Sequence, residues 1–153
     1  MVSLSAEVRG RLETEQKIAQ VVRDLKGEPF LRAMRDSTLD VSRTAKRLAP
    51  VDQGRLRQSI TPAVRLSGNN VIGVVGSNVT YAPFVELGTK PHWMPVGAIA
   101  GWARRHNMNP YAVARAIARR GTKPVRFLWR AYERHADRIQ QRLEEAVEGI
   151  VRQ

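Results

Sequence analysis

The sequence predicts an α+β domain in which helices pack on one face of a small antiparallel sheet, with long N- and C-terminal helices. Apolar residues recur at helical spacing over residues 5–48 and again over residues 125–152. Residues 58–76 alternate apolar and polar side chains around a polar turn, which is the pattern of a β-hairpin. The chain has 153 residues, the usual size of one domain with its own core. We therefore expect a single domain over residues 1–153.

The N-terminal helical region is expected in two parts. Its first part carries an apolar stripe of Val8, Leu12, Ile18, Ala19, Val22 and Leu25. Residues 26–29 contain a glycine and a proline, which interrupt the helix. The second part carries an amphipathic stripe at spacings of three, four or seven, made of Phe30, Met34, Val41, Ala45 and Leu48. Pro50 ends it, and Asp52 and Gly54 favour a turn, because a carboxylate accepts local backbone hydrogen bonds and glycine adopts unusual φ values.

The predicted turn covers residues 51–57, and the hairpin follows it. The first strand is expected over residues 58–66, where Pro62 indicates an edge or a bulge because proline cannot donate to the ladder. Residues 67–70 supply turn chemistry, and residues 71–76 supply a second strand rich in valine and isoleucine.

The second half of the chain is predicted to be helical. A short helical turn is expected within residues 80–90, and a short helix over residues 96–105. Asn109, followed by proline, is a helix start, and Gly121 ends that helix. One long helix is then expected over residues 125–152, with an inward stripe of Leu128, Ala131, His135, Ile139, Leu143, Val147 and Ile150.

Composition excludes several classes of protein. The chain contains no cysteine, so a disulfide framework and a thiolate metal site are excluded. The first residues are charged early and lack the apolar segment of a signal peptide. No stretch approaches 18 apolar residues, so we expect no contact with a membrane. These features fit assembly in a reducing cytoplasm.

The positive charge is concentrated in one part of the sequence. The net charge is +12, and between Glu86 and Glu133 nine basic residues occur without an acidic one. A stretch of one sign creates a positive field, for which nucleic acid is the commonest partner. A solvated surface that keeps the protein soluble explains the same pattern.

No catalytic or metal-binding pattern is evident. His92, His106 and His135 lack a second ligand at the spacing that a metal site on a helix needs. Asp52 and Glu86 are isolated carboxylates, for which structural roles are favoured over general acid/base catalysis. We expect no cofactor and no enzymatic activity.

The basic segment also contains aromatic residues. Trp102 and Phe127 fall at apolar helical positions and are expected in the core, whereas Trp93 lies between two prolines and is a candidate for an exposed contact. Alanines leave the helix before Gly121 poor in side chains that read bases, so any DNA contact is expected to be non-specific. The residues expected to face DNA or a partner are Arg104, Arg105, Arg115, Arg119, Arg120 and Lys123.

Three segments carry a resemblance to a known family. They are residues 49–60 (APVDQGRLRQSI), residues 81–89 (YAPFVELGT) and residues 121–131 (GTKPVRFLWRA). In this order and spacing they resemble the phage tail-component family typified by gene product ten of phage HK-ninety-seven, whose members are called minor tail, tail-completion or neck proteins. The resemblance covers residues 20–145, within which residues 92–120 are an insertion-like helical segment.

The resemblance implies an α+β fold without catalysis. It assigns structural roles to the motif residues Asp52, Gly54, Arg55, Tyr81, Phe84, Glu86, Gly88 and Phe127. Tyr81 and Phe84 are expected as packing anchors, and Glu86 as an ion-pair partner of Arg55 or Arg57, within or between subunits.

The resemblance also implies a place in the virion. It implies a homo-oligomeric ring at the head–tail junction, around a channel for double-stranded DNA, after assembly in the host cytoplasm. The implied neighbours are head-side connector or adaptor proteins and tail terminator or tail tube proteins. Two other functions stay open from the sequence. One is a free-standing basic nucleic-acid-binding protein, and the other, which lacks a metal cluster or a nucleophile–base pair, is a small nuclease or toxin.

Overall fold

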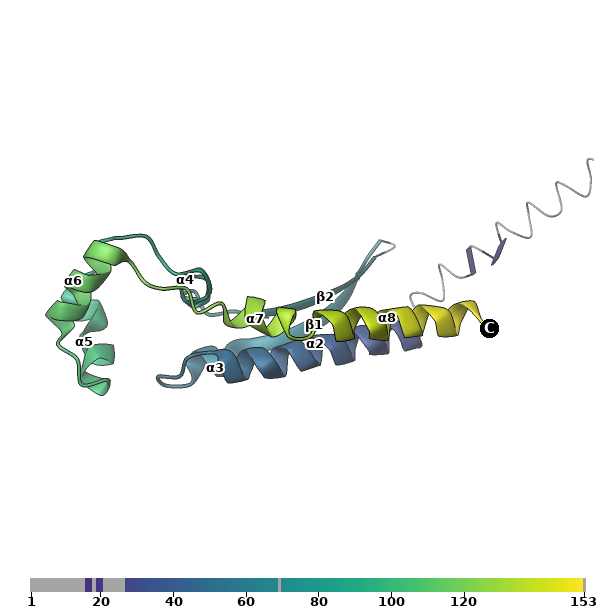
Figure 1. Cartoon of the computed structure of the whole chain (residues 1–153), viewed down its shortest axis with the longest axis horizontal. Helices are drawn as coiled ribbons and strands as arrows, with labels where there is room; N and C mark the ends of the chain where they lie inside the picture. Colours follow the sequence, from purple (N-terminus) through teal and green to yellow (C-terminus); the bar gives the residue numbers. More distant parts are fainter. Residues whose placement is uncertain (1–15, 18, 21–26, 69, 153) are drawn as a thin grey trace, which may run out of the picture. The chain divides into compact units, whose positions relative to one another are not determined.

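The computed structural model describes residues 16–17, 19–20, 27–68 and 70–152. Most of these residues are helical, and the expected α+β class with long N- and C-terminal helices is confirmed (Figure 1). The expected helix over residues 5–25 lies largely outside the described part. In chain order the elements are α2 (Glu28–Leu48), α3 (Arg55–Ser59), β1 (Ile60–Ser67), β2 (Asn70–Ser77), α4 (Ala82–Leu87), α5 (Val96–Arg105), α6 (Pro110–Arg120), α7 (Phe127–Glu133) and α8 (Ala136–Val151).

Contacts group the chain into two compact units, to both of which α2 and the hairpin contribute. The first unit contains the described residues up to Asp40, Pro62–Val74 and the residues from His135 onward. The second unit contains Val41–Thr61 and Val75–Arg134.

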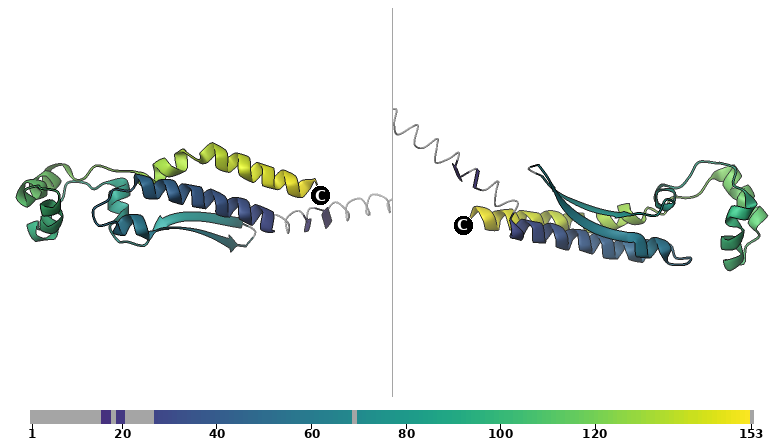
Figure 2. Two further views of the ribbon diagram at one scale, coloured as in Figure 1. Left: turned by 90° about the horizontal axis from the view of Figure 1, so that it is seen from below. Right: turned by 180° about the vertical axis from the view of Figure 1, so that it is seen from behind.

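In the first unit, α2 lies between the hairpin and α8 (Figure 2). Gly73 of β2 faces α2 closely, since a Cβ atom at this glycine would lie 2.6 Å from Cγ2 of Thr38. On the other side of α2, Arg142 of α8 donates hydrogen bonds to Oγ of Ser37 over 3.1 Å and to the Asp40 carboxylate over 2.9 Å. A glycine therefore allows the strand to approach α2, and a charged hydrogen-bond network fixes α8 to it.

Small polar side chains line the buried face of α2. Ser37, Thr38, Ser42 and Thr44 are buried. The Ser37 hydroxyl donates to the carbonyl oxygen of Ala33 over 2.7 Å, so its burial leaves no unsatisfied group. Hydroxyl groups that bond within their own helix let neighbouring elements approach the helix closely.

The buried residues of the second unit are mostly small, and one aromatic ring is among them. Phe127 is the largest fully buried residue of the described chain, as its apolar helical position predicted. The other residues of this unit that are no more than 5% exposed are Ser42, Thr44, Ala45, Ala49, Leu56, Ile60, Ala82, Ala103, Ala114 and Ala131.

The hairpin is confirmed, but its first strand begins later than predicted. Residues 55–59 form α3 instead of turn and strand, because Gly54 adopts a positive φ of 78° and its carbonyl oxygen accepts from the backbone N–H of Gln58. Arginine, leucine and glutamine favour a helix here, and Leu56 is buried. Alternating burial starts only at Ile60.

The expected single C-terminal helix over residues 125–152 is wrong. The structure divides it into α7 and α8, with Arg134 and His135 between them. His135 has a φ of −116°, outside the helical range, so the helix cannot continue through it. No glycine or proline marks this break, and the apolar spacing continues across it.

Candidate functional site

The second and third sequence motifs meet where α4 contacts the start of α7. The carboxylate of Glu86 accepts hydrogen bonds from the backbone N–H groups of Leu128 and Trp129, both over 2.9 Å. The carbonyl oxygen of Glu86 also accepts from the N–H of Arg126 over 3.1 Å. Glu86 thus satisfies N–H groups that the first turn of a helix leaves without partners. The expected ion pair of Glu86 with Arg55 or Arg57 is not formed within the described chain.

A second junction lies at the two ends of residues 92–120, which the resemblance gives as insertion-like and which we call the inserted segment. Thr89 and Thr122 form an antiparallel bridge with backbone N–H···O distances of 3.1 and 3.2 Å. Gly88 and Gly121 flank the bridge with φ values of 72° and 68°. A Cβ atom on Gly121 would collide with the Thr89 carbonyl oxygen. These glycines allow the chain to leave and return at one point.

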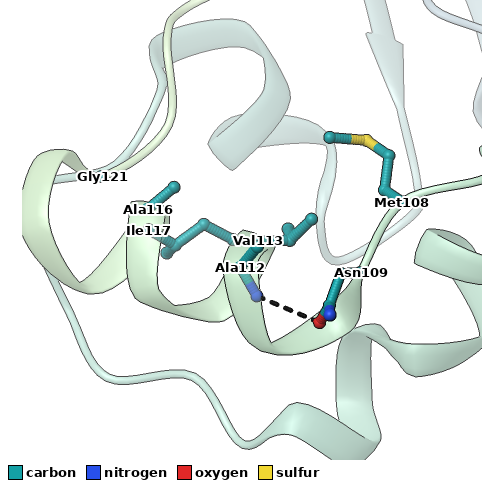
Figure 3. Close-up of a pocket in the computed structure, with 7 residues that line it drawn as sticks. All are labelled: Met108, Asn109, Ala112, Val113, Ala116, Ile117 and Gly121. Atoms are coloured by element: carbon teal, nitrogen blue, oxygen red, sulfur yellow. Dashed lines mark hydrogen bonds between the residues drawn. The ribbon is translucent and has the colours of Figure 1, made fainter.

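Within the inserted segment, α5 and α6 form a helical pair around Ala103, Ala114 and Ile117. The predicted bounds of both helices are confirmed. Asn109 caps α6, because its side-chain oxygen accepts from the N–H group of Tyr111 over 2.9 Å and from that of Ala112 over 3.4 Å. Figure 3 draws the second of these hydrogen bonds.

The first motif contacts the inserted segment through Asp52. Nε of Arg105 donates to the Asp52 carboxylate over 2.9 Å, and Nη2 of Arg105 donates to its second oxygen. Nε2 of His106 lies 3.3 Å from the same carboxylate, and the His106 ring stacks on Trp102 with centroids 4.5 Å apart. The hydrogen bonds from Arg105 hold the pKa of Asp52 below its ordinary value, because they favour the charged carboxylate.

The basic residues expected to face a partner are all exposed. Arg105 is engaged by Asp52, and Nε of Arg104 donates to the carbonyl oxygen of Ala100 in its own helix. Within the part of the chain that the structure describes, no ion pair involves Arg115, Arg119, Arg120 or Lys123. These four cations are therefore available to an external partner.

Large apolar side chains gather on α4 and α7. Phe84 and Leu87 of α4 are 60% and 74% exposed, and Trp129 and Tyr132 of α7 are 54% and 49% exposed. We call these four residues the apolar patch. The ring centroids of Trp129 and Tyr132 lie 5.9 Å apart.

The exposure of the second motif differs from the expectation. Phe84 is exposed and Tyr81 is 40% exposed, so neither side chain anchors the core of the described chain, and Ala82 is the buried residue of this motif. Leu87 and Tyr132 were not among the residues predicted to be exposed or to contact a partner. The signal in the sequence that could have identified them is their position close to Glu86 and Leu128, the motif residues through which α4 and α7 are hydrogen-bonded.

Two further features of the described chain bear on function. A groove of about 300 Å³ on α6 is lined by Met108, Asn109, Ala112, Val113, Ala116, Ile117 and Gly121 (Figure 3). Its lining is almost wholly apolar, and Asn109 already caps the helix, so it offers little to orient a polar ligand. Trp93 is 75% exposed, as predicted.

The described residues contain no group of three histidine or acidic side chains that could hold a metal ion. No helix among them has the length and apolar character needed to cross a bilayer.

Comparison with known proteins supports the family suggested by the motifs. Residues 13–88 match the family model described as "Bacteriophage HK97-gp10, putative tail-component". The first motif and the second motif up to Gly88 lie within this match, whereas the inserted segment and the third motif lie outside it. Searches of curated proteins and of solved structures gave no significant match. Through residues 13–88, therefore, the chain belongs to the HK97-gp10-like family of putative bacteriophage tail components.

Proposed function

We propose that the chain is a subunit of a ring at the head–tail junction of a tailed bacteriophage, a neck or tail-completion protein. Copies of the chain form a homo-oligomeric ring around the channel through which double-stranded DNA passes. The ring lies between head-side connector or adaptor proteins and the tail terminator or tail tube proteins. Membership of a tail-component family supports a structural role in the virion in place of catalysis.

The observation that carries the proposal is the apolar patch. Its four large apolar side chains are exposed on two helices that contact each other, and aromatic side chains are enriched in the centres of protein interfaces. Hydrogen bonds from the start of α7 to Glu86 hold the two helices of the patch together. The patch is thus a firmly held surface, suited to a contact with another copy of the chain.

The location of the chain in the virion can be tested on particles of the phage that encodes it. We expect gold-labelled antibodies against the chain to mark the head–tail junction in electron micrographs. Labelling of the tail tip, or absence of the chain from purified particles, would overturn the proposal.

Self-association can be tested by light scattering at low and high salt. We expect the wild-type chain to form a closed oligomer, and the double variant Leu87→Ser, Trp129→Ser to stay monomeric. A matched control is Leu66→Ser, Val74→Ser, which changes two exposed apolar side chains of the hairpin. A wild-type chain that is monomeric both in solution and after release from disrupted particles would contradict a ring.

A second candidate is a free-standing basic nucleic-acid-binding protein. The segment between Glu86 and Glu133, with nine basic residues and no acidic one, favours it. This function predicts a small species that binds DNA in a salt-dependent manner and is missing from the virion. The antibody experiment separates the two candidates.

A further inference from the structure

We propose that the exposed face of α6 binds the phosphate backbone of duplex DNA without sequence preference. This face consists of Tyr111, Arg115, Arg119 and Arg120, and we call it the α6 basic face. The inference rests on the proposed function in one respect, since the duplex that this face would contact is the one that passes through the proposed ring.

The first argument is the sign of the charge around α6. Of the nine basic residues between Glu86 and Glu133, Arg105 alone forms an ion pair with a carboxylate of the described chain. The unpaired cations extend beyond α6 to Lys90, Lys123 and Arg130. A field of one sign over such a length suits a polyanion, because each neutralised phosphate releases a condensed counterion.

The second argument is the arrangement of side chains on α6. Tyr111, Arg115 and Arg119 follow one another at intervals of four residues, so they form one row along the helix, and all three are exposed. Successive members lie about 6 Å apart along the axis. Arginine and tyrosine side chains are both common donors to phosphate oxygens.

The third argument concerns the surface beside this row. The neighbouring positions are Ala112 and Ala116, and Arg120 follows them at the same interval of four residues. Because alanine side chains are short, a sugar–phosphate strand can approach the helix beside the row that contains Arg115 and Arg119. The alanines offer no hydrogen-bonding group to a base edge, and this face carries no asparagine or glutamine to read adenine. Its arginines donate to phosphate oxygens as readily as to guanine, so we place the contact at the backbone.

The end of the helix is not the binding site. A helix N-terminus attracts anions through its free N–H groups, but Asn109 already accepts from the N–H groups of Tyr111 and Ala112. The duplex therefore lies along the side of α6.

Two junctions hold α6 in position for this contact. The Thr89–Thr122 bridge fixes both ends of the inserted segment, and Asp52 fixes Arg105 at the end of α5. Side chains on a held helix lose less freedom on binding than side chains on a free loop.

An acidic surface of an adjoining protein ring is the competing partner. Protein interfaces are usually centred on buried aromatic or apolar anchors. The α6 basic face, by contrast, consists of three arginines and a tyrosine, and the short side chains of Ala112 and Ala116 lie beside it. This arrangement favours a polyanion with evenly repeated charges.

The test is the salt dependence of binding to a fluorescently labelled duplex, measured by anisotropy with the full-length chain. The variant is Arg115→Gln, Arg119→Gln, Arg120→Gln. The control is Arg32→Gln, Arg57→Gln, Arg65→Gln, which removes three exposed positive charges from α2, α3 and β1.

We expect the variant to lower the slope of log affinity against log salt by about three, and the control to leave most of it. Between about 50 and 200 mM salt, the wild-type affinity should then fall about 40-fold more than that of the variant. Duplexes rich in A·T and in G·C should bind with affinities within about threefold of each other.

Equal slopes for wild type and variant would overturn the inference, and so would a strong sequence preference. It would also be overturned if the wild-type chain bound polyglutamate through these arginines but showed no affinity for DNA, which would identify an acidic protein surface as the partner. Light scattering of the same variant distinguishes the two proposals. A variant that still assembles but loses DNA binding supports both the ring and the DNA contact of α6. A wild-type chain that binds DNA through α6 but never assembles contradicts the ring alone.

Discussion

Asp52, in the loop before α3, and Arg105, at the end of α5, form an ion pair across 53 positions of the sequence. Asp52 belongs to the part of the chain that matches the family, whereas Arg105 lies outside that match. A motif residue that was expected to accept local backbone hydrogen bonds therefore contacts the inserted segment instead. The same ion pair removes Arg105 from the cations available to DNA, which leaves the three arginines of α6 as the centre of the positive surface.

Replacement of Glu86 should destabilise the fold through α7. In Glu86→Ala the backbone N–H groups of Leu128 and Trp129 lose their acceptor, so we expect the free energy of unfolding to fall by about 1–3 kcal/mol. Glu86→Gln retains one acceptor oxygen and should lose less. Urea denaturation measures both, with Glu145→Ala as a control at an exposed site whose carboxylate accepts from Gln141. Equal stability of Glu86→Ala and the control would show that this contact contributes nothing.

Two glycines should respond in opposite directions to substitution by alanine. Gly121→Ala forces a Cβ atom against the Thr89 carbonyl and requires a positive φ, so it should cost more than about 1 kcal/mol. Gly149 lies within α8 with nothing within 4 Å of an added Cβ atom. Gly149→Ala should therefore raise stability by about 0.5–1 kcal/mol, because alanine favours a helix. Thermal unfolding compares the two variants, and a stabilised Gly121→Ala would refute the tight approach at the Thr89–Thr122 bridge.

The contact of Asp40 with Arg142 should make stability depend on pH in the acid range. The hydrogen bond from Arg142 holds the pKa of Asp40 below its ordinary value of 3.8. A depressed pKa in the folded state stabilises the fold above the unfolded pKa, and this contribution is lost as pH falls through the folded pKa. We expect Asp40→Asn to be less stable than wild type at neutral pH, by a difference that shrinks below pH 3.8. Urea midpoints across this range measure it, and a difference independent of pH would contradict the assignment.

Local signals in the sequence predicted much of the fold. The bounds of α5 and α6 follow from prolines, from the cap at Asn109 and from Gly121, all of which act within a few residues. Alternating apolar residues predicted the hairpin, and helical spacing predicted the burial of Phe127. Each of these features depends on the conformation of a short segment and its nearest contacts.

The contacts that build the site could not be predicted in the same way. Glu86 lies 42 positions from Leu128 in sequence, so its role at the start of α7 depends on how the chain folds back. The break at His135 has no glycine or proline to announce it. A motif shared with a family identified Phe84 as important but did not reveal that its ring faces outward. Exposure depends on tertiary packing, and here it changes the interpretation of Phe84 from a core anchor to a candidate interface residue.

Excision of the inserted segment tests how far assembly and DNA binding are separable. Thr89 and Thr122 already lie side by side, with backbone N–H···O distances of 3.1 and 3.2 Å, so a short glycine–serine linker can replace residues 92–120 without moving either end. Shortening a loop changes the entropy of closure only slowly, and Phe127 and the apolar patch lie outside the excised residues. We therefore expect the shortened chain to unfold cooperatively in urea and to reach the same oligomeric mass in light scattering. It should lose most of its DNA affinity, because Arg115, Arg119 and Arg120 are removed.

A shortened chain that cannot fold would show that α5 and α6 belong to the core of the second unit. A shortened chain that folds but keeps the full salt dependence of DNA binding would move the DNA contact away from α6.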